Sequence, residues 1–276
     1  MENSILFPTS SFGKRLKSML KVDFRRIYKS RLFYILIACA LLIPIVMTVM
    51  MTMMDGTVST NPQTGEETVI HGPESAWQSI GTLPTAGGTA VEGAAMGGMD
   101  VMAMCNINMM FMLVAVFICL FISDDFRSGY AKNLFTVRAK KGDYVVSKTI
   151  AGFFCGALML VAYFIGAMLG GSISGLSFDL GQLTLGNIIL CMIAKTFLML
   201  VFVSIFVLIS VAAKQKAWLC ICGSLGGGML LFMMVSMITP LNATMIHVLL
   251  CLAGGVMFAA GLGAISKLVL KKSSLV

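Results

Sequence analysis

Six long apolar stretches, separated by polar segments, constrain this 276-residue chain more than any other feature. A helix needs about 20 mostly apolar residues to cross the hydrocarbon core of a bilayer. The stretches that meet this length are residues 32–54, 102–123, 149–172, 187–213, 218–238 and 245–266. Charged residues make up only 12% of the chain, about half the share of a soluble domain. These features exclude a disordered chain, argue against a soluble enzyme, and predict an all-α membrane protein with six transmembrane helices.

The positions of the basic residues predict how the chain is oriented. Of the 20 Lys and Arg residues, 19 lie before the first stretch, between the second and third, between the fourth and fifth, or after the last. Cytoplasmic loops of membrane proteins carry an excess of Lys and Arg, so both termini are expected inside. The net charge of +8 lies in these membrane-flanking blocks. It therefore gives no reason to expect a nucleic-acid partner.

The chain divides into three expected parts. Residues 1–31 end in an amphipathic segment that predicts a cytoplasmic interfacial helix, residues 32–266 form the six-span membrane domain, and residues 267–276 form a cytoplasmic tail. The apolar face of the segment carries Phe12, Leu16, Met19, Leu20, Phe24 and Ile27. Such a helix lies in the membrane interface and attracts anionic lipid, which makes membrane lipid an expected partner. A solvated basic arm is the alternative.

Two regions between the spans carry distinct signals. The outer loop 55–101 holds six acidic residues and no Lys or Arg, which either attracts cationic peptides or follows from keeping basic residues inside. The inner loop 124–148 mixes charges with Leu134, Phe135 and Val137, and it contains Gly129 and Gly142. This mixture is typical of a surface that docks another protein.

Familiar catalytic chemistry is missing from the sequence. It contains no GxxxxGK[ST] phosphate loop, no HExxH motif, no CxxC pair, and no pair of carboxylates within a span. We therefore expect no catalytic residue, no metal site and no cofactor in this chain. We expect a partner protein to supply the energy that this membrane protein uses.

A resemblance supports this expectation. The stretch Asp124-Asp125-Phe126-Arg127-Ser128-Gly129-Tyr130-Ala131-Lys132-Asn133-Leu134 resembles the pattern that follows the second span in permeases of the ABC-2 family. Tyr130 stands where the family usually has Thr. The resemblance implies a six-span permease of the type V exporter kind, working as a dimer with two cytosolic ATPases that hold ATP and Mg. It further implies an ATPase-coupling set of Asp124, Asp125, Arg127, Gly129, Lys132, Asn133, Arg138 and Lys141.

The same resemblance suggests a role. Bacterial members of this half-size layout often export peptides or protect the cell from bacteriocins. We therefore expect a permease of the bacterial cytoplasmic membrane that exports hydrophobic or amphipathic peptides. An exporter of drugs, lipid-linked molecules or ions is the first alternative, and a membrane immunity or scaffold subunit without transport is the second.

Polar and sulfur-containing residues in the outer halves of the spans give a candidate cargo pathway. Lys195 lies inside the fourth apolar stretch, where it either lines a wet vestibule or extends outward along its helix. Its candidate polar neighbours are Asn106 and Asn108. Methionines cluster toward the same side, among them Met50, Met109 and Met233, and serve packing, an adaptable cargo surface or Cu(I) binding.

A stripe of small residues marks the third span. Its members are Gly152, Gly156, Gly166 and Gly170. At 3.6 residues per turn these glycines lie on one side of a helix, where another helix can approach closely. We expect the stripe to serve packing within the protein.

Overall fold

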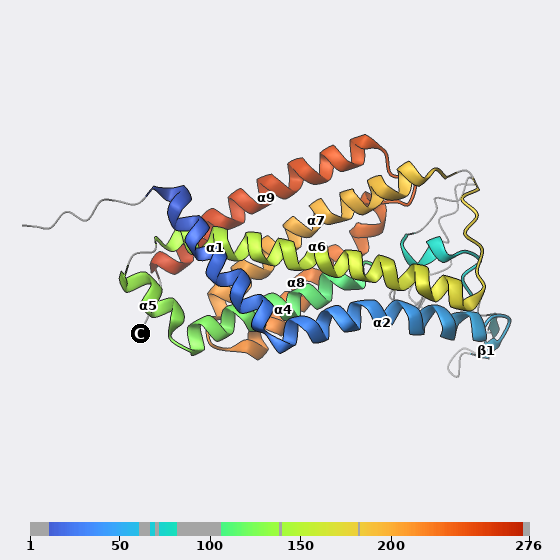
Figure 1. Cartoon of the computed structure of the whole chain (residues 1–276), viewed down its shortest axis with the longest axis horizontal. Helices are drawn as coiled ribbons and strands as arrows, with labels where there is room; N and C mark the ends of the chain where they lie inside the picture. Colours follow the sequence, from blue (N-terminus) through green and yellow to red (C-terminus); the bar gives the residue numbers. More distant parts are fainter. Residues whose placement is uncertain are drawn as a thin grey trace, which may run out of the picture.

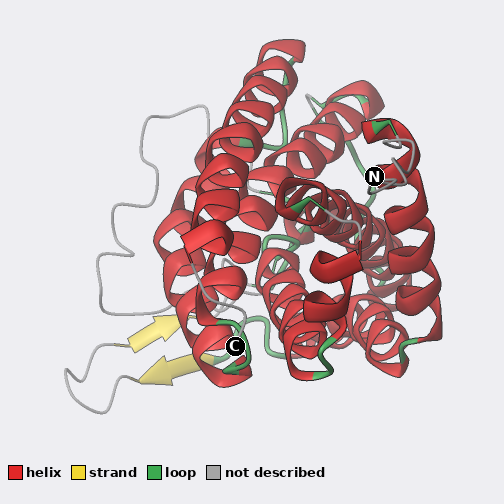
Figure 2. Ribbon diagram, turned by 90° about the vertical axis from the view of Figure 1, so that its left-hand side faces the viewer, coloured by secondary structure: helices red, strands yellow, loops and turns green. Residues whose placement is uncertain are grey.

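A computed structural model describes residues 11–60, 67–69, 72–81, 106–137, 140–181 and 183–272. This part of the chain is almost entirely helical, with one small antiparallel hairpin (Figure 2). The helices are α1 (Phe12–Lys29), α2 (Arg31–Met53), α4 (Met109–Arg127), α5 (Tyr130–Val137), α6 (Lys141–Ser174), α7 (Leu185–Ala213), α8 (Ala217–Ile238) and α9 (Met245–Lys272). The hairpin pairs β1 (Val58–Thr60) with β2 (Glu67–Val69), and a 3₁₀ turn, η1, covers Ala76–Ser79. The predicted all-α class is confirmed.

The long helices lie side by side along one axis and alternate in direction (Figure 1). Helices α1 and α5 and the last turns of α9 gather at one end, which we call the α1 end. The hairpin and η1 lie at the opposite end, the hairpin end. This alternation agrees with a chain that crosses a membrane repeatedly.

Five helices, α2, α4, α6, α7 and α9, are long and apolar enough to cross a membrane. Helix α8 has 22 residues, but its described apolar part, Ala217–Phe232, is shorter than the helices counted as long enough to cross a membrane. Hydrogen bonds nevertheless place α8 along most of α4. Ser123 donates to the carbonyl of Lys214 just before α8 begins, and Asn108 donates to Ser236 near its end. Five predicted spans are confirmed as membrane-capable helices, and the sixth stays a prediction.

Two helices begin at other residues than the approximate start of the span predicted for them. Helix α4 begins at Met109, whereas residues 106–108 form a turn and 102–105 lie outside the described residues. Helix α6 begins at Lys141, two turns before the predicted span, because its first residues are polar and bond to other helices. Hydropathy marks where a helix can contact lipid, and a helix can continue beyond that point.

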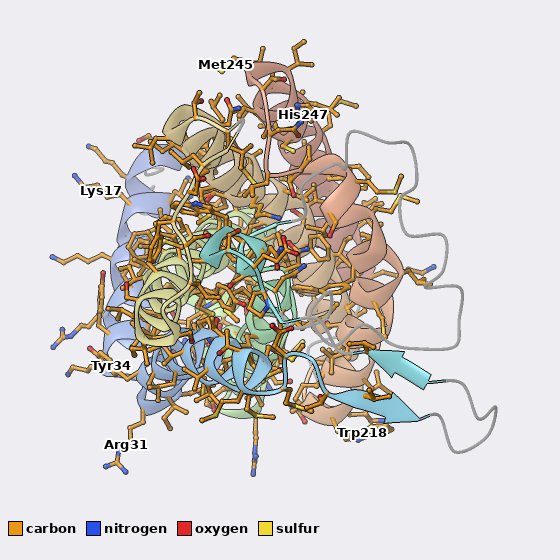
Figure 3. The ribbon with its side chains drawn as sticks, turned by 90° about the vertical axis from the view of Figure 1, so that its right-hand side faces the viewer. Lys17, Arg31, Tyr34, Trp218, Met245 and His247 are labelled. Carbon is orange, nitrogen blue, oxygen red and sulfur yellow. The ribbon has the colours of Figure 1, made fainter. Side chains whose placement is uncertain are left out.

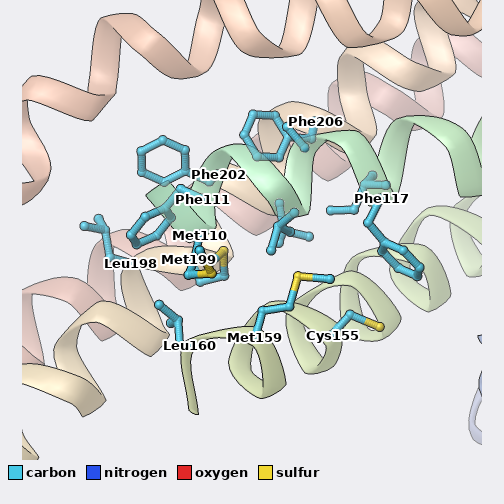
Figure 4. Close-up of a cluster of buried hydrophobic side chains, with 14 of the residues drawn as sticks. Met110, Phe111, Phe117, Cys155, Met159, Leu160, Leu198, Met199, Phe202 and Phe206 are labelled. Atoms are coloured by element: carbon cyan, nitrogen blue, oxygen red, sulfur yellow. The ribbon is translucent and has the colours of Figure 1, made fainter. Parts of the chain in front are cut away.

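The core lies between α4, α6 and α7, whose facing sides carry large apolar residues. Figure 4 shows Phe111 and Phe117 from α4, Met159 from α6, and Phe202 from α7 in this cluster. The rings of Phe111 and Phe202 lie 4.5 Å apart, a favourable aromatic contact. Helices α2 and α9 are mostly exposed and pack on the outside of α6 and α7.

The glycine stripe of α6 does bring helices close together. A Cβ atom on Gly166 would lie 2.3 Å from the carbonyl oxygen of Leu41, and one on Gly170 would lie 3.0 Å from the Cα of Ile45. Both contacts are with the backbone of α2. Gly152 and Gly156 instead face side chains of α4 and α7. The expectation that this stripe serves packing is confirmed.

Helix α1 crosses the bundle obliquely at its end rather than extending away from it (Figure 1). Its apolar face is partly buried in the protein: Met19 and Ile27 are buried, and the ring of Phe24 meets that of Phe154 on α6 at 5.1 Å. Basic residues such as Lys17 point away from the bundle (Figure 3). Part of the stripe expected to face lipid therefore packs on α6.

Candidate functional site

A buried group of charged residues joins four helices at the α1 end. We call it the inner polar cluster. It consists of Asp23 and Arg26 from α1, Asp125 from α4, Tyr130 from α5, and Tyr144, Ser147 and Lys148 from α6. Asp23, Asp125, Tyr144, Ser147 and Lys148 are all buried.

Lys148 is the centre of this cluster. Its ammonium nitrogen lies 2.7 Å from a carboxylate oxygen of Asp23 and 2.7 Å from one of Asp125. Ser147 donates a hydrogen bond to the second oxygen of Asp23 at 2.7 Å. Burying a charge is costly unless the charge is paired and hydrogen-bonded, and each of these groups is both.

Arg26 completes the charge balance. Its guanidinium forms an ion pair with Asp125 and lies 3.5 Å from Asp124, while the hydroxyl of Tyr144 donates to Asp125 at 3.0 Å. The cluster thus matches two buried carboxylates with two cations. Burial alone would lower the pKa of Arg26, but the carboxylates of Asp125 and Asp23 and the nearby Tyr130 together raise it. Arg26 therefore stays charged.

Aromatic rings connect α5 to this cluster. The guanidinium of Arg26 lies 4.6 Å from the centre of the Tyr130 ring, a cation–π distance. Burial, together with the carboxylates of Asp23 and Asp125, raises the pKa of Tyr130, so its hydroxyl stays neutral. Phe135 also packs edge-on against Tyr144 at 5.3 Å. Any displacement of α5 would therefore act directly on the ion pairs that hold α1, α4 and α6 together.

The structure places the predicted ATPase-coupling residues in different environments. Asp124, Arg127, Lys132 and Asn133 are exposed, whereas Asp125 is fully buried. Gly129 forms the turn between α4 and α5 with a φ of 73°, and Lys141 donates to the carbonyl of Leu270. Arg138 lies outside the described residues. Leu134 and Phe135, expected to form part of a docking surface, are partly buried and pack against the core.

Sequence reasoning does not find the partners of Asp125. The resemblance marks Lys148 only as one of the basic positions that follow the motif, and the sequence does not single out Asp23 or Tyr144. One signal is present: Asp23 is the only acidic residue between Phe12 and Lys29, and it lies close to the apolar stripe. A carboxylate in that position needs a cation from another element.

A second polar group lies toward the hairpin end, which we call the outer polar cluster. Its members are Asn106 and Asn108 before α4, Lys195 on α7, Ser236 on α8 and Thr239 just after it. The ammonium of Lys195 donates to Asn108 at 2.8 Å and to Thr239 at 3.1 Å. Asn108 in turn donates to Ser236 at 3.0 Å.

Lys195 is completely buried, so neither expected environment is seen. It neither lines a wet vestibule nor extends outward to the membrane surface, because two neutral acceptors inside the bundle hold its ammonium. Asn108 is a direct partner, as expected, whereas Asn106 contributes by accepting from the backbone of Asn108 at 2.9 Å. Met50 is half exposed on α2, Met109 is partly buried on α4, and the side chain of Met233 lies outside the described part.

The bond between Asn108 and Lys195 makes a testable prediction. We expect Asn108→Leu to lower the free energy of unfolding by about 1.5–3 kcal/mol, because a buried cation loses an acceptor. The double variant Asn108→Leu/Lys195→Met is expected to recover most of the loss, since it removes the cation as well. Thermal unfolding of the purified proteins measures both effects. A double variant no more stable than Asn108→Leu would contradict this account of Lys195.

Comparison with known proteins adds one finding. Residues 19–226, three quarters of the chain, match the family model described as "ABC-2 family transporter protein". No curated protein and no solved structure matches the chain. The matched region contains the inner polar cluster, α5, Lys195 and most of the membrane-capable helices. The chain belongs to the ABC-2 family of transporter proteins.

Proposed function

We propose that this protein is the permease subunit of an ATP-driven exporter, and that a separate cytosolic ATPase docks on α5. Its family and its apolar helices make it a multi-pass membrane protein and the permease component of an ABC transporter. The family also implies partnership with an ABC ATPase. The observation that carries the docking proposal is the placement of α5, a short helix whose exposed side is polar and whose buried side rests on the inner polar cluster.

The two sides of α5 have different roles in this proposal. Ala131 is fully buried, and Leu134 and Phe135 pack partly against the core. Lys132, Asn133 and Thr136 are exposed, so they are available to a partner. The buried side of α5 holds it to the bundle, and its polar side remains open to a partner. A partner that moves α5 can therefore move the helices beneath it.

The coupling route follows from these contacts. When ATP closes the ATPases, they move α5, and the contacts of Tyr130 and Phe135 pass the movement to Arg26, Tyr144 and Lys148. Helices α1, α4 and α6 then shift together and reshape the cavity between this chain and a second permease copy. The distribution of basic residues supports placing the α1 end in the cytoplasm of a bacterial cell.

Hydrophobic or amphipathic peptides are the cargo that we propose. Flexible methionines suit a surface that accepts varied apolar cargo. Met50, Met53, Met237 and Met245 are exposed near the ends of their helices at the hairpin end. With the α1 end inside, this is the side from which cargo would leave.

The turn at Gly129 provides the test of coupling. Proline cannot adopt the φ of 73° seen there, whereas asparagine tolerates this left-handed region. Gly129→Pro is expected to leave the permease in the membrane and ATP hydrolysis active while abolishing peptide export. Gly129→Asn, the matched control, should export normally. Export by the proline variant at the wild-type rate would overturn the proposed route.

A further inference from the structure

A hollow of about 630 Å³ opens at the α1 end, beside the inner polar cluster, with which it shares Arg26. It lies between α1, the first turns of α2, the last turns of α4 and the turn between α7 and α8. Its lining residues include the basic side chains Arg25, Arg26, Lys29 and Arg127 and the apolar side chains Leu32, Phe117, Leu120 and Phe121. Asp124 is the one carboxylate residue of the lining.

Three of the four basic residues are available to a ligand. Arg26 is held by Asp125, but Arg25, Lys29 and Arg127 are exposed and form no ion pair with any residue that the structure describes. Arg25 and Lys29 are four residues apart on α1 and therefore lie on the same side of that helix. Arg127 approaches from the last turn of α4. The rim of the hollow is therefore strongly positive.

The apolar part of the hollow belongs to membrane-capable helices. Leu32 lies in the first turn of α2, and Phe117, Leu120 and Phe121 lie along α4, up to nearly three turns before Arg127 and deeper into the bundle. A ligand that fills this space needs an anionic part at the rim and an apolar part below it. A free phosphate would satisfy only the rim.

We propose that this hollow binds an anionic glycerophospholipid from the leaflet at the α1 end. Its phosphate lies among Arg25, Lys29 and Arg127, and an acyl chain descends along Leu32, Phe117 and Phe121. The site depends on the protein lying in a membrane, but not on ATPase docking or on the direction of transport. Because Arg26 lines the hollow and also holds Asp125, the bound lipid lies against the contact between α1 and α4.

Binding of dioleoyl phosphatidylglycerol to the purified full chain, measured by native mass spectrometry without any ATPase, tests this site. Dioleoyl phosphatidylcholine is the neutral comparison. Lys29→Gln/Arg127→Gln is expected to weaken phosphatidylglycerol binding about thirtyfold, since each basic residue near a membrane surface contributes about a five- to sixfold effect. Lys14→Gln/Lys17→Gln removes the same charge from exposed positions on α1 outside the hollow, and should change binding less than about threefold.

Two more measurements distinguish a lipid site from a general attraction of anions to a basic surface. Lys29→Arg/Arg127→Lys keeps both charges and should retain binding, which shows that the loss does not come from misfolding. Soluble glycerol 3-phosphate at the same concentration should not displace the lipid. Equal binding of phosphatidylcholine, an equal loss in the Lys14/Lys17 pair, or displacement by glycerol 3-phosphate would overturn the proposal.

Discussion

Asp125→Ala is expected to lower the free energy of unfolding by about 3–5 kcal/mol, the effect of breaking a buried ion pair from one side. Asp125 is fully buried and accepts from Tyr144, Lys148 and Arg26. Its loss leaves Lys148 paired with Asp23, and leaves Arg26 with the exposed Asp124 at 3.5 Å. Chemical denaturation of the purified protein in detergent gives the measurement.

The neighbouring residue provides the control. Asp124 has the same side chain one position earlier, but it is 68% exposed and lies 3.5 Å from Arg26. Asp124→Ala should therefore lower the stability by at most about 1 kcal/mol. Asp125→Asn keeps the shape of the side chain but not its charge, so its loss of stability should lie between those of Asp124→Ala and Asp125→Ala. Similar losses for Asp124→Ala and Asp125→Ala would mean that the inner polar cluster does not hold these helices together.

Gly166→Ala is the second substitution with a large expected effect. The added Cβ would lie 2.3 Å from the Leu41 carbonyl oxygen, a backbone atom that cannot rotate away. Helices α2 and α6 must therefore separate along their contact, and overpacking of this kind costs about 1–3 kcal/mol or more. Thermal unfolding is expected to occur at a clearly lower temperature than in the wild type.

Substitutions of two other glycines serve as controls for this prediction. Gly254 on α9 has open space around its Cβ position, so Gly254→Ala should be neutral or slightly stabilising. Gly156 faces the buried side chain of Met199, whose Cγ would lie 2.7 Å away; a side chain shifts more readily than the backbone, so Gly156→Ala should cost less than Gly166→Ala. If all three variants unfolded alike, close approach of the α2 and α6 backbones would not be what Gly166 provides.

Features that depend on residues close together in the chain could be predicted from the sequence. Apolar runs locate five membrane-capable helices, the amphipathic pattern locates α1 within two residues of its ends, and the glycine spacing identifies the packed side of α6. Each of these features depends on residues close together in the chain. The short helix α5 is expected from sequence only as a structured loop, because its apolar face spans just eight residues.

The polar clusters cannot be derived in the same way. Lys148 meets Asp23 across 125 positions, and Lys195 meets Asn108 across 87. Such pairs depend on how the helices pack, and a single sequence contains no measure of that packing. Asp125 illustrates the result: the local motif suggests a contact with another protein, whereas the bundle folds around this carboxylate.

Crosslinking from α5 tests the central claim most directly. A photoreactive amino acid at the exposed position of Asn133 would be activated in cells, and its adducts identified by mass spectrometry. The same label at Ser177, exposed near the hairpin end, is the control. We predict that position 133 captures a protein with the GxxxxGK[ST] phosphate loop of an ABC ATPase and that position 177 does not. Capture of that ATPase from position 177 alone, or from neither position, would contradict an ATPase docked on α5.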